Sequence, residues 1–457
     1  MPKYKGFKKS FNLYAEALKY LPSGVSSNAR LWRAGICPPG LPCTLFVKRA
    51  KGAYIWDVDG NRYIDYRLGY GPVILGHNYS KVSSAVHEAE KLGAVYAAGH
   101  EMEIKVAKKL CSIIPSAEMV RFSNTGTEAT MNAIRIARAA TKKDKVIKFE
   151  GHFHGTHDYL LWSTQPPFDW PLRKHNQTPH QQSLGIPEAI KETILVERWN
   201  NFESIEKTVR ENQDKVAAII TEPIMGNSAA IMPKDGYLKH LRELCDRHDI
   251  LLIFDEVKTG FRADLGGAQR LFKVTPDIAA IAKAMGNGYP VSAIVGKKEY
   301  MDLVGPGKVS HGGTYSSNPV SLAAVYATIQ EMERKSVIDR VNRFGRKLME
   351  GLNEVLNDLG IPHIINGIPA MFQIAFTNKS ELREWRDLEF CELKMYPLLQ
   401  ADLMGRGVMT DADIEEPIFL SYSHKQKEID QTLEAYQKAC DECWQKIIKE
   451  VRKLNSI

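Results

Sequence analysis

The chain lacks several features that would assign it to a binding or membrane class. No uncharged stretch approaches the about 20 apolar residues of a membrane span, and the start, MPKYKGFKKSF, has no apolar signal core. The net charge of +7 is spread along the 457 residues rather than concentrated in a basic patch. These absences predict a cytoplasmic protein with no membrane partner and no nucleic-acid partner.

Cysteine is also sparse, with seven residues scattered through the sequence. An odd, scattered set argues against a disulfide framework. Cys440 and Cys443 form a CDEC pair, but no second pair at metal-ligand spacing accompanies it. We therefore predict no metal site.

What is present is an alternation of short apolar runs with longer amphipathic segments. From about Val146 onward, runs such as VAAII and ILLIF alternate with segments such as GYLKHLRELCDRHD. Apolar runs of four to eight residues between helices are typical of parallel strands covered on both faces. We therefore predict a large α/β domain over residues 76–325.

The two ends of the chain have a different texture. Strand candidates and long helices after about Val320 predict a smaller α+β domain over residues 326–457. Residues 1–75 contain a helical stretch and two β-rich runs that flank Asp59-Gly60-Asn61, which is a hairpin signal. We expect this N-terminal segment to contribute to the small domain and to the active-site entrance.

Three polar residues follow three of the apolar runs. Glu222 follows VAAIIT, Asp255 follows ILLIF, and Lys283 follows IAAIA. In an open parallel sheet, ligands bind beyond the carboxyl ends of the strands. Each residue alone could be a helix cap or part of a surface ion pair, but together they predict two acids and a lysine at one rim.

A helix start adds a possible anion site. In SNTGTEATMNAIRIARAA, Thr125 and Glu128 fit the S/T-x-x-E capping box, so a helix should begin near Gly126. The amides of Gly126 and Thr127 would then be free to bind a phosphate at the positive end of the helix. An ordinary well-capped helix start remains the alternative, and the P-loop pattern is absent.

Pyridoxal phosphate is one ligand that suits all of these groups. It needs a lysine for a Schiff base, a carboxylate that faces its ring nitrogen, and a phosphate site. Asp255 would keep the ring nitrogen protonated, because a nearby carboxylate favours the charged pyridinium. Lys283 would bind the cofactor and then carry the proton during catalysis.

Six ordered motifs resemble the class III family of pyridoxal phosphate aminotransferases. They are SNTGTEA, GHFHG, TEPIMGN, IFDEVKTGFR, AKAMGNGYP and HGGTYSSNP. The resemblance extends from about Leu21 to Glu434. Within the family, LPSGVSSNAR and EPIFLSYSH resemble elements of the glutamate-1-semialdehyde 2,1-aminomutases and their related transaminases.

The resemblance implies an aspartate aminotransferase-like structure of fold type I, in which a large, mostly parallel-sheet domain carries a smaller α+β domain. It also implies a homodimer with shared active sites, a small-molecule amino donor and a keto acceptor. The residues that it places around the cofactor are Gly126 and Thr127 at the phosphate, Phe153 and Val257 on the two ring faces, Glu222 and Asn227 on the ring-hydroxyl side, and Thr314 at the phosphate of the neighbouring subunit.

On the substrate side, the resemblance implies that Arg30 binds the substrate carboxylate, where a planar guanidinium can bind both oxygens. It places Glu416 where it could pair with Arg30 when substrate is absent. Tyr70 and Phe153 are candidate pocket walls, although plain packing explains them equally well.

One segment departs from the aminomutase pattern. Residues 162–187 are longer than the glycine-rich gating segment of those enzymes and carry Trp162, Phe168 and Trp170. Because an aminomutase must retain its intermediate, this change favours amino transfer between two molecules. An aminomutase or a racemase remains the alternative. A non-catalytic protein on the same fold is disfavoured by the presence of Lys283 and Asp255, and a Rossmann protein by the absence of G-x-G-x-x-G after a strand.

Overall fold

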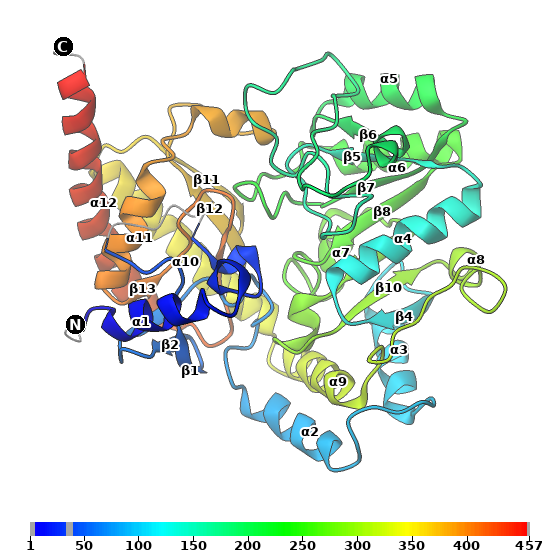
Figure 1. Ribbon diagram of the computed structural model, residues 1–457, viewed down its shortest axis with the longest axis horizontal. Helices are drawn as coiled ribbons and strands as arrows, with labels where there is room; N and C mark the ends of the chain where they lie inside the picture. Colours follow the sequence, from blue (N-terminus) through cyan, green and yellow to red (C-terminus); the bar gives the residue numbers. More distant parts are fainter. Residues whose placement is uncertain (1–4, 33–39, 455–457) are drawn as a thin grey trace.

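The computed structural model describes residues 5–32 and 40–454, with side chains in the last helix only as far as residue 449. Its centre is a seven-stranded sheet in the order β4-β10-β9-β8-β7-β5-β6 (Figure 1). Strands β5 to β9 run parallel, whereas β10 runs antiparallel to both of its neighbours. The prediction of a mostly parallel sheet is thus confirmed. The strands are β4 (Met119–Ser123), β5 (Lys145–Phe149), β6 (Ile194–Glu197), β7 (Val216–Thr221), β8 (Leu251–Glu256), β9 (Ile278–Ile281) and β10 (Ser292–Gly296).

Apolar residues on both faces bury this sheet between two layers of helices. Along β8, Ile253 packs in the core beneath α4, whereas Leu252 and Phe254 pack in the larger core on the opposite face. Burying each such side chain stabilises the fold by about 1.5 to 3 kcal/mol. The helices that accompany the sheet are α2 (Ser80–Glu90), α3 (Glu101–Ile113), α4 (Gly126–Thr141), α5 (Phe202–Asn212), α6 (Tyr237–His248), α7 (Gly267–Phe272), α8 (Lys298–Met301) and α9 (Pro319–Arg334).

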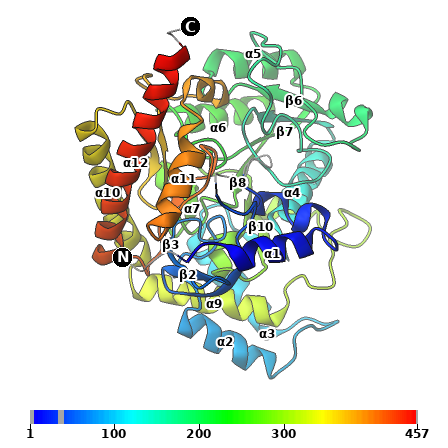
Figure 2. The same cartoon turned by 60° about the vertical axis from the view of Figure 1, so that its left-hand side comes forward.

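The two ends of the chain meet in a second layer of structure beside the large sheet (Figure 2). The N-terminal elements are α1 (Lys8–Ala17), β1 (Val47–Lys51), β2 (Tyr54–Asp57) and β3 (Arg62–Asp65). The C-terminal region, residues 337–454, contains α10 (Val337–Asp358), β11 (Ile364–Ile368), β12 (Met371–Ala375), α11 (Met395–Gly405), β13 (Val408–Met409), β14 (Ile418–Phe419) and α12 (Gln426–Leu454). Parallel pairing of β3 with β13 joins the two ends in one four-stranded sheet.

The predicted N-terminal hairpin is present as β2 and β3, which pair antiparallel. Its turn contains Gly60 with a φ of 90°, a conformation that glycine adopts without strain. Asp57 closes the turn, because its Oδ1 accepts a hydrogen bond of 2.8 Å from the amide of Asn61. The domain limits at residues 76 and 326 stay predictions.

Two further observations concern membrane-spanning helices and the cysteines. Across residues 5–32 and 40–454, none of the helices is both long enough and apolar enough to cross a bilayer. Cys43 is disulfide-bonded, whereas Cys111, Cys245, Cys391, Cys440 and Cys443 are free.

Candidate active site

Three of the predicted site residues lie at the carboxyl ends of adjacent parallel strands. Glu222 follows β7, Asp255 is the penultimate residue of β8, and Lys283 begins a 3-10 turn just after β9. Lys283 has a φ of 47°, a left-handed conformation that is uncommon for a residue with a side chain. The strands β7, β8 and β9 are neighbours, and parallel strands present their carboxyl ends at one edge of a sheet, so the three groups share one site.

Asp255 is held in place by two hydrogen bonds inside the protein. Its Oδ1 accepts a bond of 3.0 Å from the amide of Val257, and its Oδ2 lies 2.8 Å from Nδ1 of His154. Burial raises the pKa of Asp255 to about 7, while the Val257 amide and the charges of Lys283 and Lys258 oppose that rise. A nearby cationic partner would therefore change the charge state of this carboxyl group.

Glu222 accepts hydrogen bonds from three surrounding N–H groups. Its Oε1 lies 2.8 Å from the amide of Phe153 and 3.1 Å from Nδ2 of Asn227, and its Oε2 lies 2.9 Å from the amide of Gly226. Burial and the neighbouring Asp255 carboxylate raise the pKa of Glu222 to about 7. Glu222 and Asn227 therefore lie together in a fixed mutual orientation, and their place on the ring-hydroxyl side stays a prediction.

Lys283 has the properties of a nucleophilic amine. Burial, and next the positive charge of Lys258, lower the pKa of Lys283 to about 7. A large fraction of the amine is consequently neutral near neutral pH, and only the neutral form attacks a carbonyl group. The carboxylates of Glu416, Glu222 and Asp255 raise the pKa of Lys283 and so oppose this effect.

The predicted capping box opens α4. Oγ1 of Thr125 accepts a hydrogen bond of 3.2 Å from the amide of Glu128, whose Oε2 accepts one of 2.8 Å from the amide of Thr125. The helix begins at Gly126, as predicted. A methyl group at Gly155 would lie 2.6 Å from Oγ1 of Thr127, so only a glycine leaves this corner beside the helix start open.

One of the two residues predicted for the ring faces, Val257, lies beside this helix start. A Cβ at Gly126 would lie 3.1 Å from both Cγ atoms of Val257, which places Val257 directly against the helix start. Phe153 is 40% exposed, so its ring is available to stack on a ligand. The donor set of a near-neutral amine, a buried acid and a helix start with adjacent glycines fits pyridoxal phosphate.

The predicted substrate-side residues are only partly brought together. Arg30 is exposed at the end of the 3-10 turn Asn28–Arg30 and makes no ion pair with any residue in the described part of the chain. Tyr70 donates its hydroxyl hydrogen bond to the carbonyl oxygen of Ala29 and accepts one from Arg67. Arg67 in turn pairs with Asp411 at 2.7 Å.

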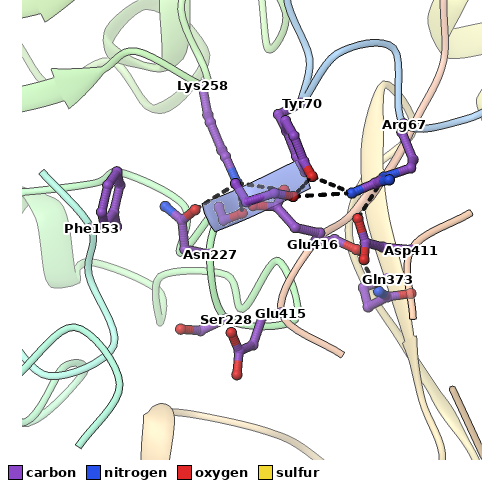
Figure 3. Close-up of polar contacts among 12 residues, drawn as sticks. Arg67, Tyr70, Phe153, Asn227, Ser228, Lys258, Gln373, Asp411, Glu415 and Glu416 are labelled. Atoms are coloured by element: carbon purple, nitrogen blue, oxygen red, sulfur yellow. Dashed lines mark hydrogen bonds and ion pairs between the residues drawn. The ribbon is translucent and has the colours of Figure 1, made fainter. Parts of the chain in front are cut away.

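Glu416 does not pair with Arg30. Both of its carboxylate oxygens accept hydrogen bonds from Nζ of Lys258, at 3.0 Å and 2.8 Å. Figure 3 shows Lys258 pointing toward both Asn227 and Glu416. The physical reason for the difference is that Lys258 is a buried cation that needs a countercharge, whereas Arg30 is exposed to solvent.

Thr314 is exposed in the connection between α8 and α9. The role of Thr314 toward a neighbouring subunit stays a prediction.

The long segment at residues 162–187 is fastened to the C-terminal region. The ring of Phe168 stacks on Trp385 with a centroid distance of 5.5 Å. Nη1 of Arg386 donates hydrogen bonds of 2.8 Å and 2.9 Å to the carbonyl oxygens of Phe168 and Trp170. These contacts hold the aromatic part of the segment in one arrangement.

Sequence reasoning missed His154, Lys258 and the Arg67–Asp411 pair. His154 and Lys258 both stand inside quoted motifs, GHFHG and IFDEVKTGFR. A lysine three residues after a buried strand acid was a signal that could have been used, because a buried ammonium requires a partner. The pairing of Arg67 with Asp411 has no local sequence signal.

Comparison with known proteins agrees with this geometry. The family model of the class-III aminotransferases matches residues 38–439. A glutamate-1-semialdehyde 2,1-aminomutase of Methanosphaera stadtmanae is 40% identical over 94% of this chain and 97% of its own length. One of Methanocaldococcus jannaschii is 41% identical, with the same coverage. The crystal structure of an omega-transaminase from Sphaerobacter thermophilus matches with a TM-score of 0.88 and 30% identity, over 94% of this chain and 97% of that one.

Proposed function

The chain belongs to the class-III aminotransferase family, whose cofactor is pyridoxal phosphate, and from this premise we propose that it acts as a glutamate-1-semialdehyde 2,1-aminomutase. This reaction moves the amino group of one molecule from its second carbon to its first, so substrate and product are isomers. The observation that carries the proposal is the 40% identity, over 94% of the chain, to relatives of that name. The long segment at residues 162–187 favoured transfer between two molecules. It is a single segment, however, whereas the similarity to the aminomutases includes every strand of the site.

The roles of the site residues follow from their chemistry. Bound pyridoxal phosphate supplies a ring that accepts electrons from the substrate carbon. Asp255, oriented by His154, would face the ring nitrogen and favour its protonated form. Lys283 would hold the cofactor through its amine and, when free, would carry the proton that one substrate carbon loses and the neighbouring carbon gains. Its pKa of about 7 suits both directions of that proton transfer.

The remaining residues bind and orient the cofactor and the substrate. The amides of Gly126 and Thr127 hold the phosphate at the start of α4, and Phe153 and Val257 enclose the ring. Glu222 and Asn227 lie at the ring-hydroxyl side. Arg30 binds the substrate carboxylate from its exposed turn, and Tyr70 lines the pocket. The protein works as a homodimer in which Thr314 of each subunit completes the phosphate site of the other.

A single-substrate reaction tests the proposal. Purified protein loaded with pyridoxal phosphate is given glutamate-1-semialdehyde with no amino donor and no keto acid, and the isomer 5-amino-4-oxopentanoate is measured by mass spectrometry. The expected result is many turnovers per active site. A reaction that stops after one turnover and resumes when a keto acid is added would overturn the aminomutase assignment.

Intermolecular transamination is the second candidate. It is favoured by the fastened aromatic segment at Phe168 and Trp170, and by the likeness to the Sphaerobacter thermophilus omega-transaminase. The same experiment separates the two, because a transaminase needs both a donor and an acceptor. Borohydride reduction of the loaded protein, with mass spectrometry of the peptide that contains Lys283, checks the attachment residue in either case.

A further inference from the structure

Lys258 is a second lysine in the site, and its ammonium group is fully engaged. The side chain is only 5% exposed. Its Nζ donates hydrogen bonds to the carbonyl oxygen of Gly226 at 2.6 Å, to Oδ1 of Asn227 at 2.7 Å, and to the carboxylate of Glu416 at 2.8 Å and 3.0 Å. A lysine has three N–H donors, so these partners use all of them. The pattern indicates a charged ammonium that is built into the site.

The lysine also fixes the orientation of Asn227. Because the Asn227 oxygen accepts from Lys258, the Asn227 amide nitrogen is left to face Glu222, at 3.1 Å and 3.2 Å from its two oxygens. Gly226 is needed for this arrangement, since a Cβ there would lie 2.7 Å from Cδ of Lys258. A continuous chain of contacts thus leads from Glu416 through Lys258 and Asn227 to Glu222.

We propose that Lys258 is a positioning residue, which joins Glu416 of the C-terminal region to Asn227 and Glu222 on the cofactor side and sets the electrostatic environment of the Lys283 amine. The inference rests on the proposed role of Lys283 as the cofactor-binding amine. Lys258 makes that amine easier to deprotonate, and Glu416 limits the effect by partly neutralising Lys258.

The charged groups around Lys283 come from several elements, and their effects have opposite signs. Lys258, just after β8, lowers the pKa of Lys283 in addition to the effect of burial. Glu416 ahead of β14, Glu222 after β7 and Asp255 on β8 raise it. The Lys258 charge also lowers the pKa values of Glu222 and Asp255. Removing the charge of Lys258 should therefore raise the pKa of Lys283, and removing the charge of Glu416 should lower it.

Two variants test this inference on the full-length protein freed of cofactor. Lys258→Met keeps most of the length of the side chain and removes its charge, and Glu416→Gln keeps the shape of its partner and removes the opposite charge. Competitive acetylation with acetic anhydride across pH 5 to 10, with mass spectrometry of the Lys283 peptide, gives the pKa of the amine in each protein. We expect Lys258→Met to raise it by on the order of one pH unit and Glu416→Gln to lower it.

Opposite pKa shifts of Lys283 in the two variants would distinguish an electrostatic role from a general loss of structure. Shifts of the same sign in both variants, or no shift in Lys258→Met, would overturn the inference. If Lys258→Met does not fold, Glu416→Gln still decides, because an unchanged or raised pKa in that variant contradicts the proposal. The labelling needs no turnover, so a wild-type protein that fails the aminomutase assay or the borohydride test would disprove the proposed function while leaving this measurement readable.

Discussion

Nδ1 of His154 lies 2.8 Å from Oδ2 of Asp255, and both side chains are buried at the carboxyl end of β8. Burial, together with the charge of Lys148, keeps the pKa of His154 well below its usual value, so the imidazole is neutral. The hydrogen bond between Nδ1 and the Asp255 carboxyl group holds that group in one orientation. A neutral imidazole steadies Asp255 without cancelling the negative charge that a protonated ring nitrogen needs.

The raised pKa of Asp255 makes the stability of the cofactor-free protein depend on pH. The folded protein keeps this proton up to about pH 7, whereas the unfolded chain loses it near the ordinary aspartate pKa of 3.8. The resulting stabilisation is fully present below about pH 4 and is lost as the pH rises through 7. Asp255→Asn cannot lose the proton, so its free energy of unfolding should fall less between pH 5 and 8. Urea unfolding at several pH values measures this slope.

A matched control for that slope is Asp235→Asn, which removes a carboxyl group at an exposed position. The slope of its free energy of unfolding between pH 5 and 8 should equal that of the wild-type protein. Equal slopes for wild type and Asp255→Asn would show that Asp255 is ionised in the cofactor-free site.

Gly155 should be essential to the phosphate site. Its φ is 92°, and an added Cβ would lie 2.6 Å from Oγ1 of Thr127. We expect Gly155→Ala to lower the free energy of unfolding by about 1 to 3 kcal/mol through backbone strain and to weaken pyridoxal phosphate binding by displacing Thr127. Fluorescence titration with the cofactor and urea unfolding measure the two effects.

Gly185→Ala supplies the comparison, because Gly185 has a φ of 87° and no atom within 4 Å of its ideal Cβ. It should show the backbone strain without the loss of cofactor affinity. Equal cofactor affinity in the two variants would mean that the corner beside Thr127 does not hold the phosphate.

Local patterns were sufficient for much of this architecture. The run ILLIF predicted a strand buried on both faces, and β8 has that burial because its residues alternate between two cores. Thr125 and Glu128 predicted the start of α4 correctly, since a capping box involves residues only three positions apart. The convergence of Glu222, Asp255 and Lys283 followed from the rule that parallel strands present their carboxyl ends at one edge.

Contacts between distant segments were not predictable in the same way. Lys258 and Glu416 are 158 positions apart, and the choice of Lys258 over Arg30 as the partner of Glu416 depends on which cation is buried. The segment at residues 162–187 was singled out in the sequence by its length and its aromatic residues. What fastens it, however, is the contact with Trp385 and Arg386, more than 200 positions away.

Arg30 should affect substrate affinity rather than stability. It lies exposed on a short turn, so Arg30→Gln removes a charge without opening the core. Loss of a charge-assisted hydrogen bond to a substrate carboxylate should raise KM roughly tenfold or more, with little change in unfolding. Steady-state kinetics with the single substrate, beside a thermal unfolding curve, test this.

Arg67→Gln gives the opposite pattern and serves as the contrast. Arg67 is partly buried and pairs with the buried side chain of Asp411 at 2.7 Å, so removing it leaves an uncompensated carboxylate. We expect a loss of about 3 to 5 kcal/mol of stability. An unchanged KM in Arg30→Gln would move the carboxylate site elsewhere, and Arg67 would then be the next arginine to consider.

Thr314 provides a test of the shared active site that does not depend on seeing the dimer. In the proposed arrangement, the site of one subunit uses its own Lys283 and the neighbour's Thr314. Lys283→Ala protein should be inactive, and Thr314→Asp protein should bind cofactor poorly, because a carboxylate would repel the phosphate. Each variant alone should therefore have little or no activity at low cofactor concentration.

Mixing the two variants distinguishes shared from separate sites. In a hybrid dimer, one site receives both substitutions, while the other combines an intact Lys283 with an intact Thr314. Random association makes half of the dimers hybrid, so about one quarter of the wild-type activity should return after the variants are unfolded and refolded together. If Thr314 acted within its own subunit, every site would carry one substitution and no activity would return. Refolding each variant separately and mixing afterwards is the control, since subunits that cannot exchange should stay inactive.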